Sequence, residues 1–323
     1  MSKKEKYKIL MLGKPGGTLA RTYNWHIQAL NGDQKNRFNV EDVLLVTNNF
    51  SKPLNIKDYD VFWFYAKAFS PDFYSKIKEL RPDAKFVCGP NVLLDKPDVG
   101  ISDTWDKWYV NEAKPDIHLD QVEFYSNHVK KFLEASTREK SKCLDKCIKI
   151  DDSLYKSDET KVYDVLLYSK KRRYDTKFET FRNQLIKLLD ENSLKYFEIR
   201  AGKFGKYERS EYFDALNKSK FLVNLSLDEC PGILNYEAMF FNVPVIGSPH
   251  NVPVNSDSSL YVEGTDEMTE EYIVRTDSAS QIYYEKISSL LKKEYNPVIQ
   301  PRDFILAHTS FERYCDNVEA LLS

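Results

Sequence analysis

Two glutamates eight positions apart, Glu229 and Glu237, have the clearest capacity for chemistry in this chain. Gly232 lies between them, and residues 221–226 before them have the apolar, β-branched composition of a buried strand. Glu229 is therefore expected in a loop at the carboxyl end of a strand, and residues 234–241 are predicted to form a short helix. A carboxylate in the first turns of that helix can accept hydrogen bonds from two adjacent sugar hydroxyls.

The start of this predicted helix also favours an anion. Its backbone N–H groups and its dipole attract negative charge, for example a diphosphate. Gly232 can take backbone dihedrals closed to other residues, which would let these N–H groups approach a ligand. Open parallel sheets bind their ligands at this edge. These residues make a site for a nucleoside diphosphate sugar the first hypothesis.

The segment resembles the Glu-to-Glu signature of retaining glycosyltransferases with the GT-B fold, especially family 4. The match includes the spacing, the glycine, and the Glu-Ala-Met and Val-Pro-Val-Ile runs that follow. The resemblance implies that Glu229 contacts the donor sugar and that Glu237 binds the ribose. It also implies donor contacts from Pro231, Gly232, Ile233 and Leu234. An ordinary loop and helix with solvated acidic residues is the alternative.

A run of basic residues follows the predicted strand at 162–168. In relatives an arginine and a lysine near this point neutralise the diphosphate leaving group, on which charge accumulates as the glycosidic bond breaks. Arg172 and Lys177 keep the usual separation of five, and Lys170 is the substitute because it better matches the strand end. A solvated basic surface is the alternative for such a run.

Four further residues are weaker candidates for donor contacts. Gly16 and Gly17 follow the predicted strand at 7–12, and the resemblance implies that they contact the donor diphosphate; a simple turn is the alternative. Their loop lacks the Gly-Lys-Ser or Gly-Lys-Thr ending of a nucleoside triphosphatase. His26, on the first predicted helix, and His250, after an apolar strand, are possible donor contacts. Structural or exposed histidines are the alternative for both.

The length of 323 residues favours two α/β domains of about 150 residues each. Strands alternate with helices in both halves, which predicts parallel, doubly wound sheets. With the resemblance, we expect two Rossmann-like domains facing a cleft, and a C-terminal helix that crosses back to the first domain. The predicted boundaries give an acceptor-side domain at 1–155, a nucleotide-sugar domain at 156–303 and the returning helix at 304–323.

The whole-chain composition narrows the possible partners and the possible location of the protein. The net charge of −2 gives no global attraction to nucleic acid or anionic lipid. No signal peptide and no run of eighteen apolar residues is visible, so a cytoplasmic protein is expected. The five cysteines form no dense framework and are expected to stay reduced. No cofactor and no metal site are expected.

The resemblance thus implies an enzyme that transfers a sugar from a nucleoside diphosphate sugar to a hydroxyl of a glycan or another acceptor. It further implies retention at the anomeric carbon and metal-independent chemistry. Three alternatives stay open: a sugar-nucleotide epimerase of the same fold, a non-catalytic sugar-nucleotide or glycan-binding module, and a glycosyltransferase that acts on modified DNA bases.

Overall fold

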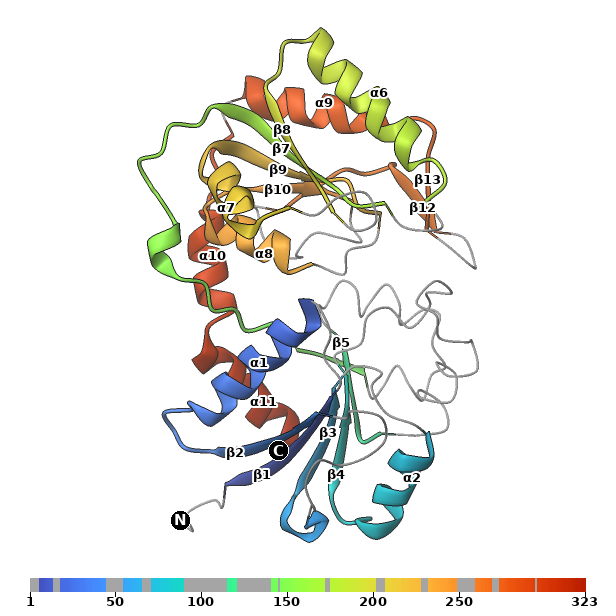
Figure 1. The fold of residues 1–323 in the computed structure, drawn as a ribbon, viewed down its shortest axis with the longest axis vertical. Coiled ribbons are helices and arrows are strands. Elements are labelled where there is room, and N and C mark those ends of the chain that lie inside the picture. The colour runs from blue at the N-terminus through green and yellow to red at the C-terminus, as the bar shows by residue number, and fades with distance from the viewer. Residues whose placement is uncertain are drawn as a thin grey trace. The chain divides into compact units, whose positions relative to one another are not determined.

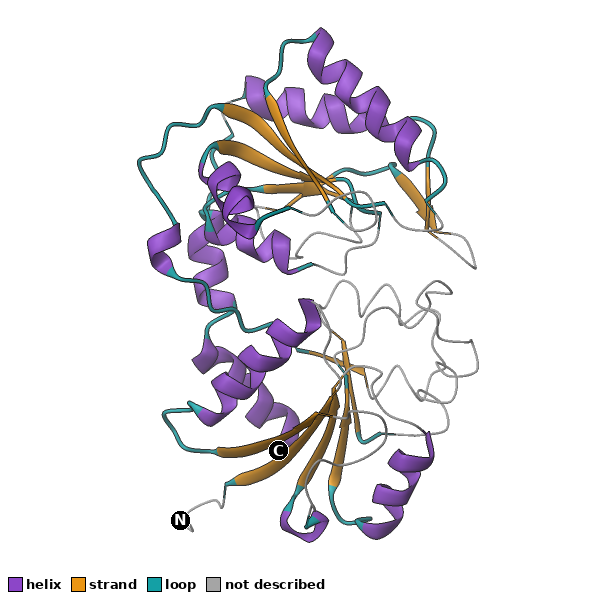
Figure 2. Cartoon of the chain, viewed as in Figure 1, coloured by secondary structure: helices purple, strands orange, loops and turns teal. Residues whose placement is uncertain are grey.

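The computed structural model of this chain describes residues 6–13, 18–44, 55–65, 71–89, 115–120, 141–144, 146–171, 175–201, 207–227, 232–248, 259–268, 273–293 and 295–323. The chain divides into two compact units. Unit 1 comprises Met1–Lys149 and His308–Ser323, and unit 2 comprises Ile150–Ala307. The elements of each unit are labelled in Figure 1 and coloured by type in Figure 2. No helix within the described residues combines the length and the apolar character needed to cross a bilayer.

Six strands of the described residues form the parallel sheet of unit 1, in the order β2-β1-β3-β4-β5-β6. The strands are β1 Tyr7–Gly13, β2 Phe38–Leu44, β3 Val61–Tyr65, β4 Lys85–Cys88, β5 Ile117–Asp120 and β6 Ser141–Cys143. The helices of this unit are α1 Thr18–Asn31, the short 3₁₀ turn η1 Ile56–Asp58, α2 Pro71–Leu80 and α11 Phe311–Leu322.

The central strand β3 shows how this sheet holds helices on both faces. All five of its side chains are buried, which fits a parallel strand covered on both sides. Successive side chains of a strand point to opposite faces. Tyr65 packs edge-on against Tyr23 of α1, with ring centroids 4.9 Å apart, whereas Phe64 packs against Tyr74 of α2 at 5.0 Å. The aromatic run of β3 therefore fills both layers of the core.

Helix α11 packs against α1, so the C-terminal segment returns to unit 1 as predicted. The Cys315 thiol donates to the carbonyl oxygen of Ala29 at 3.2 Å. The Arg37 Nη1 atom lies 2.6 Å from Asp316 Oδ1 and 2.9 Å from Glu319 Oε2. A hydrogen bond to α1 and the ion pairs with Arg37, which directly precedes β2, thus hold α11 to unit 1.

Unit 2 contains a second parallel sheet, in the order β11-β10-β9-β7-β8, and an antiparallel pair β12-β13. The strands are β7 Tyr163–Ser169, β8 Tyr196–Arg200, β9 Ser219–Asn224, β10 Val245–Gly247, β11 Ser259–Tyr261, β12 Asp266–Met268 and β13 Ile273–Arg275. The helices are the 3₁₀ turn η4 Asp152–Leu154, α6 Phe178–Glu191, α7 Arg209–Asn217, α8 Ile233–Phe240, α9 Ala279–Lys292 and α10 Pro301–His308, whose last residue belongs to unit 1.

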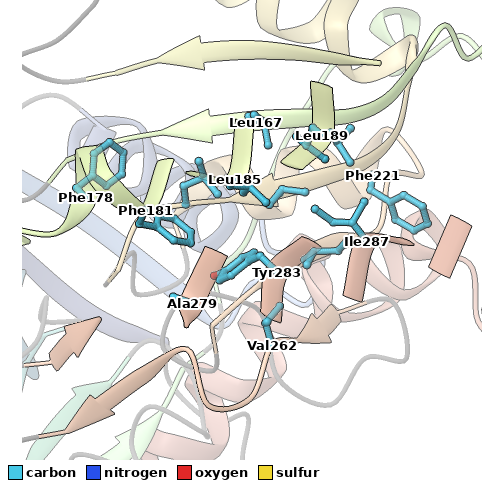
Figure 3. Close-up of a cluster of buried hydrophobic side chains, with 14 residues drawn as sticks. Leu167, Phe178, Phe181, Leu185, Leu189, Phe221, Val262, Ala279, Tyr283 and Ile287 are labelled. Atoms are coloured by element: carbon cyan, nitrogen blue, oxygen red, sulfur yellow. The ribbon is translucent and has the colours of Figure 1, made fainter. Parts of the chain in front are cut away.

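Helices α6 and α9 pack together over one face of this sheet, and α7 and α8 lie on the other face (Figure 1). Figure 3 shows the core beneath α6 and α9, where Phe181, Leu185 and Leu189 form an apolar stripe along α6. The Phe181 ring meets Tyr283 of α9 edge-on at 5.3 Å. This layer fixes the helix that begins directly after the predicted basic run.

The structure differs from the sequence-based expectation in its connecting segments. The expected final helix is two helices: α10 ends at His308, and Ser310 caps α11 by accepting a hydrogen bond from the Arg313 N–H at 3.3 Å. The sequence of residues 148–151 suggests a short strand. The structure has no strand at these four described residues, and Asp151 instead caps the turn η4 by accepting from the Ser153 N–H. The sequence also favours a strand at 122–125 and a helix at 129–135, and both ranges lie outside the described residues.

Residues 156–161 are charged and have no apolar periodicity, which predicts an interdomain linker, but in the structure this stretch packs within unit 2. The Lys156 N–H donates to Asn217 Oδ1 at 3.0 Å, and Lys161 Nζ donates to the Asn217 carbonyl oxygen at 2.8 Å. Asn217 ends α7 and is buried. The stretch is therefore part of the second unit and runs directly into β7.

Candidate functional site at the carboxyl edge of the second sheet

The strands of the unit 2 sheet are parallel, so their carboxyl ends meet at one edge. The residues that leave this edge after β7, β9 and β10 include the predicted basic run and the Glu-to-Glu segment. The structure describes only part of the predicted site. Six of its residues lie outside the described ranges, and their roles stay predictions: Gly16, Gly17, Arg172, Glu229, Pro231 and His250.

A buried pair of asparagines joins the end of β9 to the start of α8. Asn224 Nδ2 donates to Asn235 Oδ1 at 3.0 Å, and Asn224 Oδ1 accepts from the Ser226 N–H at 3.0 Å. Both asparagine side chains are fully buried, and buried amides need such partners. The bridge therefore holds together the end of β9 and the start of α8, which flank Glu229 in the sequence.

Gly232 is the N-cap residue of α8. Its φ of −58° and ψ of 151° are open to any residue, so the structure does not use the conformational freedom of glycine at this position. No side chain caps this helix, whose first residues are Ile233 and Leu234. The backbone N–H groups of a helix start have no partner within the helix, so this end of α8 presents donors suited to an anion.

The Glu237 carboxylate lies in the second turn of α8 and is only 4% exposed. A buried carboxylate needs a cation or hydrogen-bond donors to stay ionised. Arg209, the first residue of α7, provides one: its Nη2 atom lies 2.5 Å from Glu237 Oε1. The Arg209 side chain is 40% exposed, so this ion pair joins a buried acid to a guanidinium that reaches the surface.

Tyr212 fixes the two helices that carry this ion pair. Its hydroxyl donates to the Leu234 carbonyl oxygen at 2.8 Å, which ties α7 to the first turn of α8. Burial, and secondly the negative charge of Glu237, raise the pKa of Tyr212 well above its ordinary value. The phenol is therefore a neutral donor, and Glu237 is close enough to influence it.

On the other side of the sheet edge, Lys177 precedes α6 at its N-cap position. Its Nζ atom lies 2.6 Å from Asp277 Oδ1, and both side chains are exposed. Lys170, directly after β7, is half-buried. A lysine at a helix start adds positive charge where the helix dipole is already positive. The described part of the basic run is thus suited to anions, although Lys177 pairs with an acid in this structure.

Asp175 and Arg275 form a buried ion pair beside Lys177. Arg275 Nη2 lies 2.8 Å from Asp175 Oδ2 and donates to the Leu225 carbonyl oxygen at 2.9 Å. The guanidinium carbon lies 3.9 Å from the centroid of the Phe181 ring. Because Leu225 follows β9 directly, this pair fastens the segment after the basic run to the strand end that precedes Glu229.

His26 lies inside unit 1, in helix α1. Its ring is fully buried, stacks on Tyr314 of α11 at 4.6 Å, and meets Tyr65 edge-on at 5.5 Å. Burial, and secondly the positive charge of Lys146, lower the pKa of His26 to about 3. The imidazole is therefore a neutral core group here, and its suggested contact with the donor stays a prediction.

Sequence reasoning missed the residues that support the site: Asn224, Arg209, Tyr212, Asp175 and Arg275. Asn224 stands inside an apolar run and could have been noticed as a polar residue at a strand end. The two arginines give no local signal, because their partners lie 28 and 100 positions away. Ser248, just after β10, adds a buried hydroxyl without a hydrogen-bond partner among the described residues.

Comparisons with known proteins bear on the fold. No protein-family model matches the chain, and no curated protein matches it. Among solved structures, the catalytic domain of starch synthase IV from Arabidopsis thaliana, bound to ADP and acarbose, is 10% identical with a TM-score of 0.63, covering 98% of each chain. Sucrose-phosphate synthase from Thermosynechococcus elongatus is 11% identical with a TM-score of 0.58, covering 98% of each chain.

A third solved structure, that of S. aureus MnaA with UDP, is 12% identical with a TM-score of 0.54, covering 97% of this chain and 95% of that one. At these identities the likeness concerns the fold. Unit 1 and unit 2 each have a Rossmann-like parallel sheet, and α11 returns to α1. The expected fold class is therefore confirmed as α/β with two Rossmann-like units and a GT-B-like fold.

Proposed function

We propose that this protein is a retaining glycosyltransferase that transfers a sugar from a nucleoside diphosphate sugar to a hydroxyl acceptor without a metal ion. The observation that carries the proposal is the position of Glu237. It is a buried carboxylate with a cationic partner, in the second turn of an uncapped helix that follows a parallel strand. In a GT-B-like fold, this is where an acidic residue can read a ribose while the helix start binds a diphosphate.

The chemical roles follow from charge and geometry. Glu237 accepts hydrogen bonds from the ribose hydroxyls, and the N–H groups of Ile233 and Leu234 donate to the diphosphate. Lys170 and Lys177, with Arg172, stabilise the negative charge that develops on the leaving diphosphate. Glu229 contacts the donor sugar. The leaving diphosphate accepts the acceptor's proton on the same face, so the protein supplies orientation and charge stabilisation rather than a nucleophile.

Two of the similar solved structures support a nucleoside diphosphate as the bound group. The starch synthase IV domain was solved with ADP and acarbose, and MnaA was solved with UDP. The nucleobase differs between them, so the base bound by this protein has to be found by experiment. The shared element is the ribose and diphosphate, which are the groups that Glu237 and the start of α8 would bind.

The first experiment measures release of nucleoside diphosphate from a panel of UDP-, ADP- and GDP-sugars with mixed glycan acceptors. We expect release with at least one donor, with retention in the product. Glu229→Ala should abolish release. Lys177→Met should lower the turnover number roughly 100-fold, because it removes one preorganised charge opposite the leaving group. Asp277→Asn is the matched control: it removes the partner of Lys177 but not the lysine, so turnover should be unchanged or raised.

Other outcomes of the same assay correspond to the alternative functions. Binding of a nucleotide sugar without release or transfer would contradict an enzyme and indicate a binding module. Conversion of the donor into its sugar epimer, without a transferred product, would indicate an epimerase. Transfer only to hydroxymethylated or otherwise modified DNA would keep the chemistry and change the acceptor. If no nucleotide sugar is bound or cleaved, the proposal fails.

A further inference from the structure

The ion pair between Arg209 and Glu237 has an unusual distribution of exposure. The Glu237 side chain is 5% exposed, whereas the Arg209 side chain is 40% exposed. Desolvation penalises an isolated buried carboxylate heavily, and such a group takes up a proton or leaves its position. The ion pair with Arg209 therefore offsets part of the cost of burying the Glu237 carboxylate where the helix holds it.

The position of Arg209 is itself fixed. Its guanidinium carbon lies 4.8 Å from the centroid of the Phe213 ring, one turn further along α7. The neighbouring Tyr212 hydroxyl binds the backbone of α8 at Leu234. The arginine is therefore held on its own helix by an aromatic ring, and that helix is held to the one that carries Glu237. A long side chain with these constraints can act as a fixed support.

We propose that Arg209 is a positioning residue that makes Glu237 a reader of the ribose hydroxyls, and this inference rests on the proposed function. A carboxylate has about four acceptor positions, and the contact with Arg209 takes up only part of this capacity. The guanidinium keeps the carboxylate charged and sets the direction of its remaining acceptor positions. Without Arg209, the protein should lose its preference for a nucleotide that carries both ribose hydroxyls.

The test is a ratio of affinities. Isothermal titration calorimetry compares UDP, ADP and GDP with their 2′,3′-dideoxy counterparts, which lack both hydroxyls. For the nucleotide that the wild-type protein binds, we expect the ribose form to bind roughly 10-fold or more tightly, as for hydrogen bonds to a charged group. Glu237→Gln should reduce this ratio towards one. Arg209→Ala should reduce it to the same extent, and Arg209→Lys should restore part of it.

Two more variants separate positioning from stability. Arg209→Ala with Glu237→Gln removes both charges of the ion pair and should give the ratio of Glu237→Gln alone, because Arg209 acts through Glu237. Arg182→Ala is the matched control. Arg182 of α6 also pairs with a glutamate, Glu198 of β8. The Arg182 and Glu198 side chains are similarly buried, at 15% and 14% exposed. This variant should lower stability but keep the wild-type ratio.

The outcomes distinguish the inference from the proposed function. If Arg209→Ala leaves the ratio of the two affinities at its wild-type value, for example by weakening the binding of the ribose and dideoxy forms equally, Arg209 does not position Glu237. The inference is then overturned, while nucleotide binding stands. If Glu237→Gln also leaves the ratio unchanged, Glu237 does not read the ribose. If the wild-type protein binds none of the three nucleotides, the proposed function fails and the inference fails with it.

Discussion

At the scale of single residues, His26 shows how burial changes the state of a group that the sequence leaves ambiguous. Both ring nitrogens are buried without a hydrogen-bond partner among the described residues. The hydroxyl groups of Tyr65 and Tyr314, whose rings contact His26, are also buried without such a partner. An exposed histidine has a pKa of about 6.5, whereas His26 has a pKa of about 3. The ring therefore stays neutral in the folded protein across the physiological range.

This difference predicts a pH dependence of stability. In the unfolded chain His26 takes up a proton near pH 6.5, but in the folded protein only near pH 3. The contribution of the neutral ring to the free energy of unfolding is therefore fully present above pH 6.5 and is lost as the pH falls towards 3. The loss amounts to at most about 1.4 kcal/mol per pH unit. His26→Phe keeps a ring between Tyr65 and Tyr314 and should flatten this dependence, raising stability at pH 5 more than at pH 8.

Urea unfolding followed by tryptophan fluorescence measures this effect, because Trp25, Trp63, Trp105 and Trp108, the four tryptophans of the chain, lie in unit 1. Parallel stability curves for the wild type and His26→Phe between pH 5 and 8 would contradict the prediction. The same variant tests the suggested donor contact, since a histidine that only packs in the core should be replaceable without loss of turnover.

At the scale of elements, the ends of strands and helices depend on contacts that composition does not reveal. Gly89 follows β4 with a φ of +116°, and a Cβ atom added there would lie 2.4 Å from the Leu119 carbonyl oxygen. Gly264, between β11 and β12, also has a positive φ of +73°, but its Cβ would meet only the Ile282 Cδ1 atom at 3.8 Å. Both positions disfavour other residues, and only Gly89 is also crowded by backbone.

These two glycines make a matched pair. Gly264→Ala should lower the free energy of unfolding by about 1–2 kcal/mol, the cost of a left-handed conformation. Gly89→Ala should cost about 3 kcal/mol or more, because β4 and β5 have to separate to admit the methyl group. Circular dichroism during thermal unfolding of both variants gives the comparison. Equal losses would show that the sheet relaxes around Gly89 without strain.

At the scale of the whole molecule, α11 closes unit 1 through residues from both ends of the chain. The network centres on Arg37, which binds Asp33 at 2.8 Å and also reaches Asp316 and Glu319. The hydrogen bond from Arg37 lowers the pKa of Asp33 to about 2. This carboxylate therefore stabilises the fold above its unfolded pKa of about 3.9, and the contribution is lost as the pH falls from there to 2.

Arg37→Ala should loosen the last helix. It leaves Asp33 with a side chain that is only 4% exposed and without its cation, and it removes two contacts to α11. We expect hydrogen exchange of residues 311–322 to rise and the free energy of unfolding to fall by about 2 kcal/mol. Arg81→Ala breaks a pair with Asp83 elsewhere in the same unit. That control should leave exchange in 311–322 unchanged, and a rise in both variants would indicate general destabilisation.

Much of the fold could be predicted because local composition and periodicity decide strands and helices. The apolar spacing of residues 279–292 predicts a helix, and α9 has the same bounds; the composition of residues 196–200 predicts a strand, which is β8. The four-residue β5 and three-residue β6 were missed, since such short strands carry too little pattern. The predicted cleft, the domain boundaries and the roles of the predicted site residues stay predictions.

The sequence by itself determined the alternation of strands and helices, the helix that carries Glu237, and the basic residues after β7, because each depends on neighbours within a few positions. Only the tertiary structure decided which charges meet. Arg209 pairs with Glu237 across 28 positions, and Arg275 pairs with Asp175 across 100. Such pairs form when packing brings two elements together and removes water from a charge, and neither event leaves a mark in the local order of residues.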